Sequence, residues 1–194
     1  MSCDVVLVGV GGQGVLTIAD LLILSAFETG IPATYAPKKG MAQRGGFVKA
    51  EVRLGRDDVG PRIGEGKADL VVSTERSEAL NGLAFLKPSG TFLLYDDVWA
   101  PTGVMLGADA YPDRDRVIEA IRNVSEGLIL LDPSEIPSVD GRAARPNIYI
   151  LGAMVGRTSL GELLPIEAVE TTIAARWPKV REANLAAFRA GSAP

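Results

Sequence analysis

Histidine is absent from the 194 residues of this chain, and cysteine occurs once, as Cys3. Without histidine, these residues offer no Ser-His or Cys-His nucleophile pair and no His-ligated metal site. A single thiol forms no internal disulfide and does not hold a cysteine-ligated iron–sulfur cluster. Any electron carrier that works with this chain is therefore expected on another chain. Cys3 itself is predicted to be a small buried residue at the start of a strand.

A long apolar run and a basic block are missing as well. The longest apolar stretch, residues 15–27, is too short for a membrane span and contains Asp20. Because the first residues lack the basic segment of a secretory signal, we expect a cytoplasmic protein with no membrane partner. The net charge is −4 with no basic patch, which argues against a nucleic-acid partner. Apolar residues make up 47% of the chain, and this high share suggests that a partner covers part of the surface.

The most informative stretch is residues 5–14, an apolar run that ends in a glycine-dense turn. Gly9, Gly11 and Gly14 fit the spacing G-x-G-x-x-G, and an apolar helical pattern follows at once. In open α/β sheets this arrangement of strand, turn and helix offers free helix N–H groups to an anion. The alternative is a turn that only lets the strand and helix pack closely, and the residues alone favour neither. A complete NAD site ranks below both, because lysines stand where the ribose-binding acid is needed.

Apolar periodicity and turn residues divide the rest of the chain into alternating strands and helices. Strands are predicted near residues 5–8, 32–36, 47–54, 70–72, 91–95, 104–106 and 128–131. Helices are predicted near residues 13–29, 75–86, 114–124, 148–155, 165–177 and 181–189. This alternation predicts an α/β fold with three α/β/α layers, a Rossmann-like, mostly parallel sheet with helices on both faces. We expect residues 1–194 to form a single domain.

Three local expectations concern the ends and edges of these elements. Residues 47–54 alternate apolar and charged side chains, which suggests a half-exposed or edge strand. Ser73 or Thr74 is expected to cap the helix that follows it. Asn147 is likewise expected to be an N-cap.

A second candidate site is the loop of residues 38–46, which carries three cations and a glycine pair at the end of a predicted strand. Open α/β sheets bind ligands at such ends, and the guanidinium of Arg44 is suited to clamp a carboxylate or phosphate. Composition alone favours a solvated loop. Asp96 and Asp97 are more typical of a turn cap than of a Mg²⁺ site. No metal ligand is predicted, and the catalytic residues stay unassigned.

Four motifs occur together in this chain. They are Gly-Val-Gly-Gly-Gln-Gly at 9–14, Gly-Met-Ala-Gln-Arg-Gly-Gly at 40–46, Asn147 with Leu-Gly-Ala at 151–153, and Asn184 with Ala-Phe at 187–188 and Gly191. In this order they resemble the gamma-type domain of the 2-oxoacid:ferredoxin oxidoreductases. The Met-Ala-Gln-Arg-Gly-Gly form is most similar to the small (beta) subunits of the indolepyruvate branch. The resemblance covers about residues 4–191, and its first two motifs are specific as a pair.

The resemblance implies a subunit of an enzyme that oxidatively decarboxylates a 2-oxoacid, with an aryl pyruvate such as indolepyruvate expected, to an acyl-CoA and reduces ferredoxin. It places thiamine diphosphate, Mg²⁺ and the iron–sulfur clusters on a large partner subunit, with coenzyme A as co-substrate and no cofactor bound by this chain alone. The cofactor-binding set would be Gly9, Gly11, Gly12, Gln13 and Gly14. The substrate or interface set would be Met41, Gln43, Arg44, Gly45, Gly46 and Asn147. Alone, the chain is expected to be inactive.

Two other functions stay open at this point. A self-sufficient nucleotide-dependent oxidoreductase is suggested by the glycine spacing, but the chain lacks the ribose acid and an obvious proton-transfer residue. A non-catalytic binding module of the same fold is also compatible with the sequence, because a fold does not determine a function.

Overall fold

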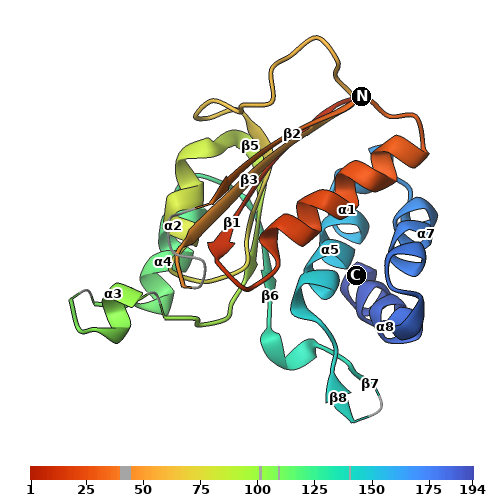
Figure 1. Cartoon of the computed structure of the whole chain (residues 1–194). Helices are drawn as coiled ribbons and strands as arrows, with labels where there is room; N and C mark the ends of the chain where they lie inside the picture. The colour runs from red at the N-terminus through yellow and green to blue at the C-terminus, as the bar shows by residue number, and fades with distance from the viewer. Residues whose placement is uncertain (40–44, 101, 109, 140) are drawn as a thin grey trace.

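A six-stranded sheet forms the centre of the molecule (Figure 1). The computed structural model describes residues 1–39, 45–100, 102–108, 110–139 and 141–194. The strands are β1 (Cys3–Val10), β2 (Ala33–Lys39), β3 (Phe47–Leu54), β4 (Ala68–Ser73), β5 (Leu86–Tyr95) and β6 (Gly127–Leu131), in the spatial order β2-β3-β1-β4-β5-β6. Strands β1, β4, β5 and β6 run parallel, and β3 pairs antiparallel with both β1 and β2. The predicted mostly parallel sheet is therefore confirmed.

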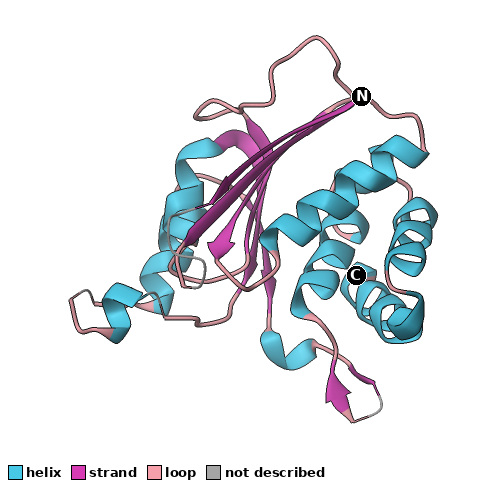
Figure 2. Cartoon of the chain, in the orientation of Figure 1, coloured by secondary structure: helices cyan, strands magenta, loops and turns pink. Residues whose placement is uncertain are grey.

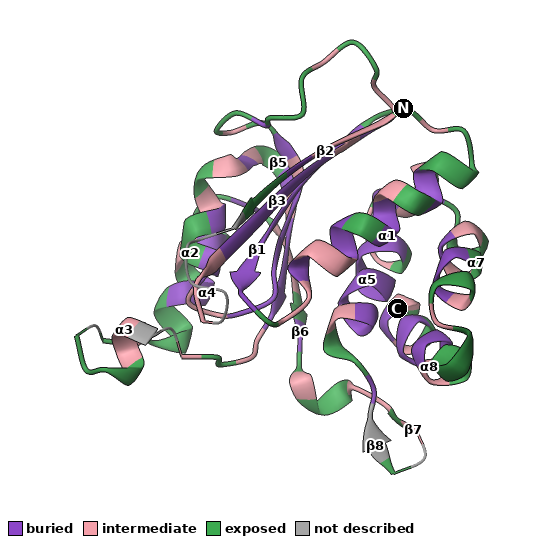
Figure 3. Ribbon diagram, in the orientation of Figure 1, coloured by how far each residue is buried: buried purple, intermediate pink, exposed green. Residues whose placement is uncertain are grey.

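Helices cover both faces of this sheet (Figure 2). One face carries α1 (Val15–Glu28), α5 (Pro146–Gly156), α7 (Ile166–Arg176) and α8 (Arg181–Ser192), and the other carries α2 (Ala79–Gly82) and α4 (Arg114–Arg122). Side chains that follow one another along a strand point to opposite faces, so Leu7 and Val6 belong to two separate apolar clusters. Strand β1 is buried at every residue because it lies between these layers (Figure 3). The three-layer α/β/α fold is confirmed.

Shorter elements connect these layers. They are α3 (Thr102–Met105), α6 (Leu160–Leu163), a two-stranded sheet of β7 (Ser138–Val139) and β8 (Arg142–Ala143), and single 3₁₀ turns at Leu83–Phe85, Pro133–Glu135 and Pro178–Val180. No helix within the described ranges combines the length and the apolar character needed to cross a membrane.

Strand β3 lies inside the sheet, and the prediction of a half-exposed or edge strand was wrong. Its charged residues Lys49 and Glu51 are only 8% and 1% exposed. Lys49 Nζ lies 2.8 Å from Glu51 Oε1 and 3.9 Å from the centroid of the Phe85 ring. Glu51 also accepts a hydrogen bond from the Ile63 N–H, which holds the loop after β3 over this face. Alternation correctly marks the polar side of the strand, but tertiary contacts supply the partners that bury it.

Two further local predictions were wrong. Residues 104 and 105 belong to α3 and residue 106 lies in the turn after it, so this segment is not a strand. Three apolar residues are too few for their periodicity to separate the two structures. The helix expected from residue 75 begins only at Ala79 and has no side-chain cap among the described residues. The hydroxyl of Ser73 donates instead to the Glu75 carbonyl, and that of Thr74 donates to Gln13.

The third and fourth sequence motifs meet where α5 packs on α8. A Cβ atom on Gly152 would lie 2.0 Å from the Phe188 carbonyl oxygen, and one on Gly191 would lie 1.9 Å from the Tyr149 carbonyl oxygen. Both glycines are therefore required for the two helix backbones to approach this closely. These two motifs stabilise the helical layer behind the sheet and lie outside the lining of the cavity described next, apart from Asn147.

Candidate functional site

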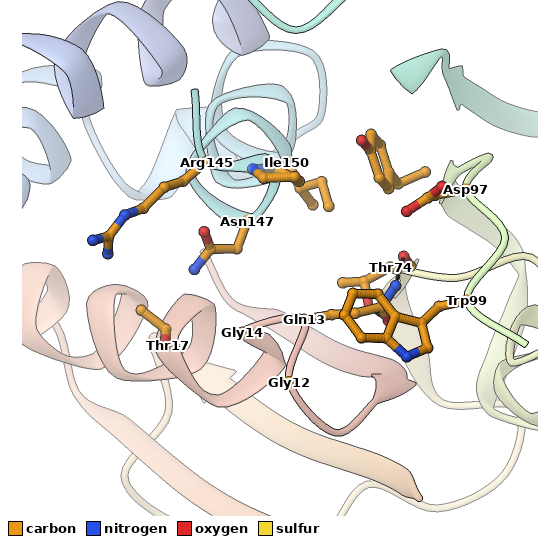
Figure 4. A pocket seen from close by; sticks show the side chains of 12 residues that line it. Gly12, Gln13, Gly14, Thr17, Thr74, Asp97, Trp99, Arg145, Asn147 and Ile150 are labelled. Carbon is orange, nitrogen blue, oxygen red and sulfur yellow. Dashed lines mark hydrogen bonds between the residues drawn. The ribbon is translucent and has the colours of Figure 1, made fainter. Parts of the chain in front are cut away.

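A cavity of about 390 Å³ lies at the carboxyl ends of β1, β4 and β5 (Figure 4). After β1 the chain continues to β2, toward one edge of the sheet, and after β4 it continues to β5, toward the opposite edge. Such a reversal opens a crevice at the strand ends, which is where open α/β sheets bind ligands. The lining consists of Gly12, Gln13, Gly14, Thr17, Thr74, Tyr95, Asp97, Trp99, Arg145, Pro146, Asn147 and Ile150.

The side chain of Gln13 joins the ends of two parallel strands. Its amide oxygen accepts from the Val10 N–H at 3.0 Å and from the Thr74 hydroxyl at 2.8 Å. Its amide nitrogen donates to the Thr74 carbonyl at 3.0 Å. An amide oxygen has two lone pairs, so both are used within the chain. Gln13 therefore fixes the glycine turn against β4.

Close contacts explain two of the glycines in this turn. A Cβ atom on Gly9 would lie 1.9 Å from Thr74 Oγ1, and one on Gly14 would lie 2.5 Å from Asn147 Nδ2. Gly14 also has φ of +83°, a left-handed conformation that glycine adopts without strain. It is the N-cap of α1, with no side-chain hydrogen bond at the cap among the described residues. The first N–H groups of α1 are thus left for another partner at the edge of the cavity.

The second glycine motif is hydrogen-bonded to the first. The Gly11 N–H donates to the Gly46 carbonyl at 2.8 Å, and the Gly45 N–H donates to the Gly11 carbonyl at 3.3 Å. The sequence places these two motifs over 30 residues apart, and the fold brings them together at one end of β1 and β3. Met41, Gln43 and Arg44 lie outside the described residues, so their roles stay predictions.

The N-terminus of α5 forms the opposite wall of the cavity. Arg145 is the N-cap and Pro146 is the first helical residue, so the prediction of an N-cap at Asn147 was wrong. Proline is suited to the first helical position, which moves the cap to the residue before it. The Asn147 side chain instead packs against Gly14 and links the N-termini of α5 and α1. The Arg145 guanidinium lies 5.5 Å from the centroid of the Trp177 ring.

The acidic residues after β5 do not form a metal site. Asp96 is paired with Arg76 and with Arg114, and both N–O distances are 2.5 Å. Asp97 lines the cavity and accepts a hydrogen bond from the Val98 N–H at 2.9 Å. Within the described ranges, no three His, Cys, Asp or Glu residues lie together as metal ligands would.

Sequence reasoning missed two aromatic residues that line the cavity, Tyr95 at the end of β5 and Trp99 after it. The backbone N–H of Trp99 donates to the fully buried carboxylate of Glu75 at 3.3 Å. The Tyr111 hydroxyl also donates to this carboxylate. Tyr95 is 3% exposed, and burial together with the nearby Asp97 carboxylate raises the pKa of its phenol. The only signal available in the sequence was the position of Tyr95 at the end of a predicted strand and of Trp99 just after it.

A family model described as pyruvate ferredoxin/flavodoxin oxidoreductase matches residues 4–193. The chain belongs to the pyruvate ferredoxin/flavodoxin oxidoreductase family. Indolepyruvate oxidoreductase subunit IorB of Archaeoglobus fulgidus is 35% identical over 192 residues, which cover 98% of this chain and 94% of that protein. The pyruvate/ketoisovalerate oxidoreductases common subunit gamma of Pyrococcus abyssi is 28% identical, with 85% of this chain and 81% of that protein covered.

Solved structures of this oxidoreductase family share the fold. Pyruvate oxidoreductase subunit PORC of Thermotoga maritima superposes with a TM-score of 0.71 at 23% identity, covering 98% of this chain and 95% of that chain. The 2-oxoglutarate:ferredoxin oxidoreductase of Magnetococcus marinus gives a TM-score of 0.69 at 17% identity, and the match covers 98% of this chain but 30% of that chain. The resemblance that the four motifs indicate is therefore confirmed at the level of the family and the fold.

Proposed function

We propose that this chain is the small subunit of a 2-oxoacid:ferredoxin oxidoreductase that acts on an aryl pyruvate such as indolepyruvate. The observation that carries this proposal is the similarity to IorB subunits, at 29–35% identity over at least 97% of this chain. On this proposal the complex oxidatively decarboxylates the 2-oxoacid to an acyl-CoA and reduces ferredoxin. The chain completes the active site and has no turnover of its own.

The described residues of this chain do not fit an iron–sulfur cluster or the Mg²⁺ of thiamine diphosphate. Cys3, the single cysteine, is 4% exposed, and burial raises the pKa of its thiol to about 12, whereas a cluster ligand must be a thiolate. Asp96 is already neutralised by two arginines, and Asp97, which lines the cavity, belongs to no group of three potential metal ligands among the described residues. We therefore place these groups, which supply carbanion stabilisation and electron transfer, on a large partner subunit.

The glycine turn is the part of this chain proposed to face the bound substrates. The N–H groups at the start of α1 and the positive end of its dipole favour an anion, such as a phosphate of coenzyme A. Gly45 and Gly46 are bonded to Gly11, so the loop that contains Arg44 ends at this turn. We propose that Arg44 binds the substrate carboxylate or another anion, and that Met41 and Gln43 contact the partner subunit.

Co-expression with a candidate large subunit tests the proposed function. We expect the two chains to co-purify, and to reduce a viologen dye anaerobically only when coenzyme A and a 2-oxoacid are both present. Indolepyruvate and phenylpyruvate are expected to be better substrates than pyruvate. If the chain neither binds the large subunit nor supports 2-oxoacid-dependent reduction, the proposal is wrong.

The loop assignment has its own test in the same assay. Arg44→Ala is expected to raise KM for the 2-oxoacid or for coenzyme A about 10-fold or more, because one charge-assisted contact is lost. Arg116→Ala, which removes an exposed arginine on α4, is the matched control and should leave both KM values unchanged. Unchanged KM values for Arg44→Ala would show that Arg44 does not bind either anion.

A further inference from the structure

The two ends of the cavity differ in chemistry, and neither end comes from the glycine motifs. Trp99 and Asp97 lie at one end and Arg145 lies at the other, with Gly12, Gly14 and Asn147 between them (Figure 4). Trp99 is 50% exposed, although its backbone N–H is hydrogen-bonded to buried Glu75. The backbone of Trp99 is therefore held in place while part of its side chain stays accessible. An aromatic face binds planar rings, and a guanidinium binds anions.

The hydroxyl of Tyr95 adds a polar group to the wall between these ends. Tyr95 is 3% exposed and lines the cavity, and its hydroxyl is not among the buried polar atoms that lack a hydrogen-bond partner. A tyrosine hydroxyl both donates and accepts, so it is able to form a hydrogen bond with a polar atom of a ligand in the cavity.

The charges along the cavity set the orientation of such a ligand. The Asp97 carboxylate at the Trp99 end repels a second anion and accepts from N–H donors. Arg145 at the far end favours negative charge, and so do the N-termini of α1 and α5 beside it. The volume of about 390 Å³ falls within the range of small-molecule sites.

We propose that this cavity binds an aromatic anion, with a planar, N–H-bearing ring against Trp99, beside Asp97 and Tyr95, and with its anionic group toward Arg145. The origin of the ligand rests on the proposed function, which supplies two compounds with this chemistry. One is an aryl 2-oxoacid such as indolepyruvate, and the other is the adenine nucleotide portion of coenzyme A. Binding itself does not depend on the proposed function.

Calorimetric titration of the full chain, alone and in complex with the large subunit, tests the proposal. The probes are indole-3-lactate, a stable analogue of the oxoacid, and adenosine 3′,5′-bisphosphate. Acetate, which lacks the ring, and tryptamine, which lacks the negative charge, are the controls. We expect one or both aromatic anions to bind at least 10-fold more tightly than either control, and the tighter one names the source. The proposal is overturned if neither aromatic anion binds to the chain or the complex, or if tryptamine binds equally well.

Single substitutions locate the site. Trp99→Ala and Arg145→Ala should each weaken binding of the preferred probe about 10-fold or more, and Tyr95→Phe should weaken it several-fold. Phe27→Ala and Arg116→Ala remove exposed side chains of the same kinds from other surfaces and should bind as the wild type does. Undiminished binding by both Trp99→Ala and Arg145→Ala would overturn the proposed site. If the chain binds the probe but fails to assemble with the large subunit, the proposed function fails and this inference stands.

Discussion

Replacing Gln13 with alanine tests whether this side chain is part of the scaffold or a ligand-binding group. The wild-type amide makes hydrogen bonds to the Val10 N–H, the Thr74 hydroxyl and the Thr74 carbonyl, at 2.8 to 3.0 Å. Each such bond contributes about 0.5–1.5 kcal/mol net, and partners left unpaired near the sheet add a cost. We therefore expect Gln13→Ala to lower the free energy of unfolding by about 2–4 kcal/mol.

Urea denaturation of the full chain measures this loss, and the thermal midpoint should fall by roughly 4–16 °C for a chain of this size. Asn123→Ala, which truncates an exposed amide at the end of α4, is the matched control and should change stability by no more than about 0.5 kcal/mol. Gln13→Glu should destabilise as well, because a carboxylate oxygen would then face the Thr74 carbonyl. Wild-type stability in Gln13→Ala would refute the scaffold role and return Gln13 to the ligand-binding set.

Three other predictions concern stability and are measured by the same denaturation assay. Gly14→Ala should cost about 2–3 kcal/mol, because it combines left-handed backbone strain with a clash against the Asn147 amide. In an Asn147→Ala background the cost should fall to about 1–2 kcal/mol, since only the strain and the 3.1 Å contact with the Cβ atom of residue 147 remain. Equal costs in both backgrounds would show that the Asn147 amide contact is unimportant. Glu51→Gln should cost about 3–5 kcal/mol by leaving the buried Lys49 ammonium unpaired, whereas the double substitution Lys49→Met, Glu51→Leu should cost much less; a mild single effect would contradict the buried pair. The pKa of Cys3 is raised from 9.0 to about 12 by burial, so the folded state holds a proton that the unfolded state loses. The contribution of the protonated Cys3 thiol to the free energy of unfolding is fully present below about pH 9 and declines toward pH 12, by up to about 1.4 kcal/mol per pH unit. Cys3→Ala should therefore lose less stability than the wild type between pH 8 and 10. Identical pH profiles would contradict the pKa shift.

The fold could be predicted from the sequence because its signals are local. The apolar run before Gly9 becomes β1, and Gly30, with φ of +70°, follows the end of α1 as glycine does after many helices. The alternation of strands and helices then leaves few topologies for the sheet. Strand β3 was placed correctly in the chain but wrongly at an edge, since its burial depends on Glu51 partners that lie elsewhere in the sequence.

The candidate site was predicted only in part, because it is assembled by the topology. Both glycine motifs could be read from the sequence, but their hydrogen bonds through Gly11 could not. Trp99 and Arg145 belong to no motif. They line one cavity because β5 ends, and α5 begins, at the carboxyl edge of the sheet. Local periodicity carries no information about such convergence.

Reconstitution from separately purified subunits tests the central claim most directly. The large subunit is assayed anaerobically for indolepyruvate- and coenzyme A-dependent viologen reduction while this chain is added in increasing amounts. The account predicts no turnover by either chain alone and activity that rises with added chain until it saturates. Full activity of the large subunit alone, unchanged by addition of this chain, would contradict the claim that this chain completes the active site.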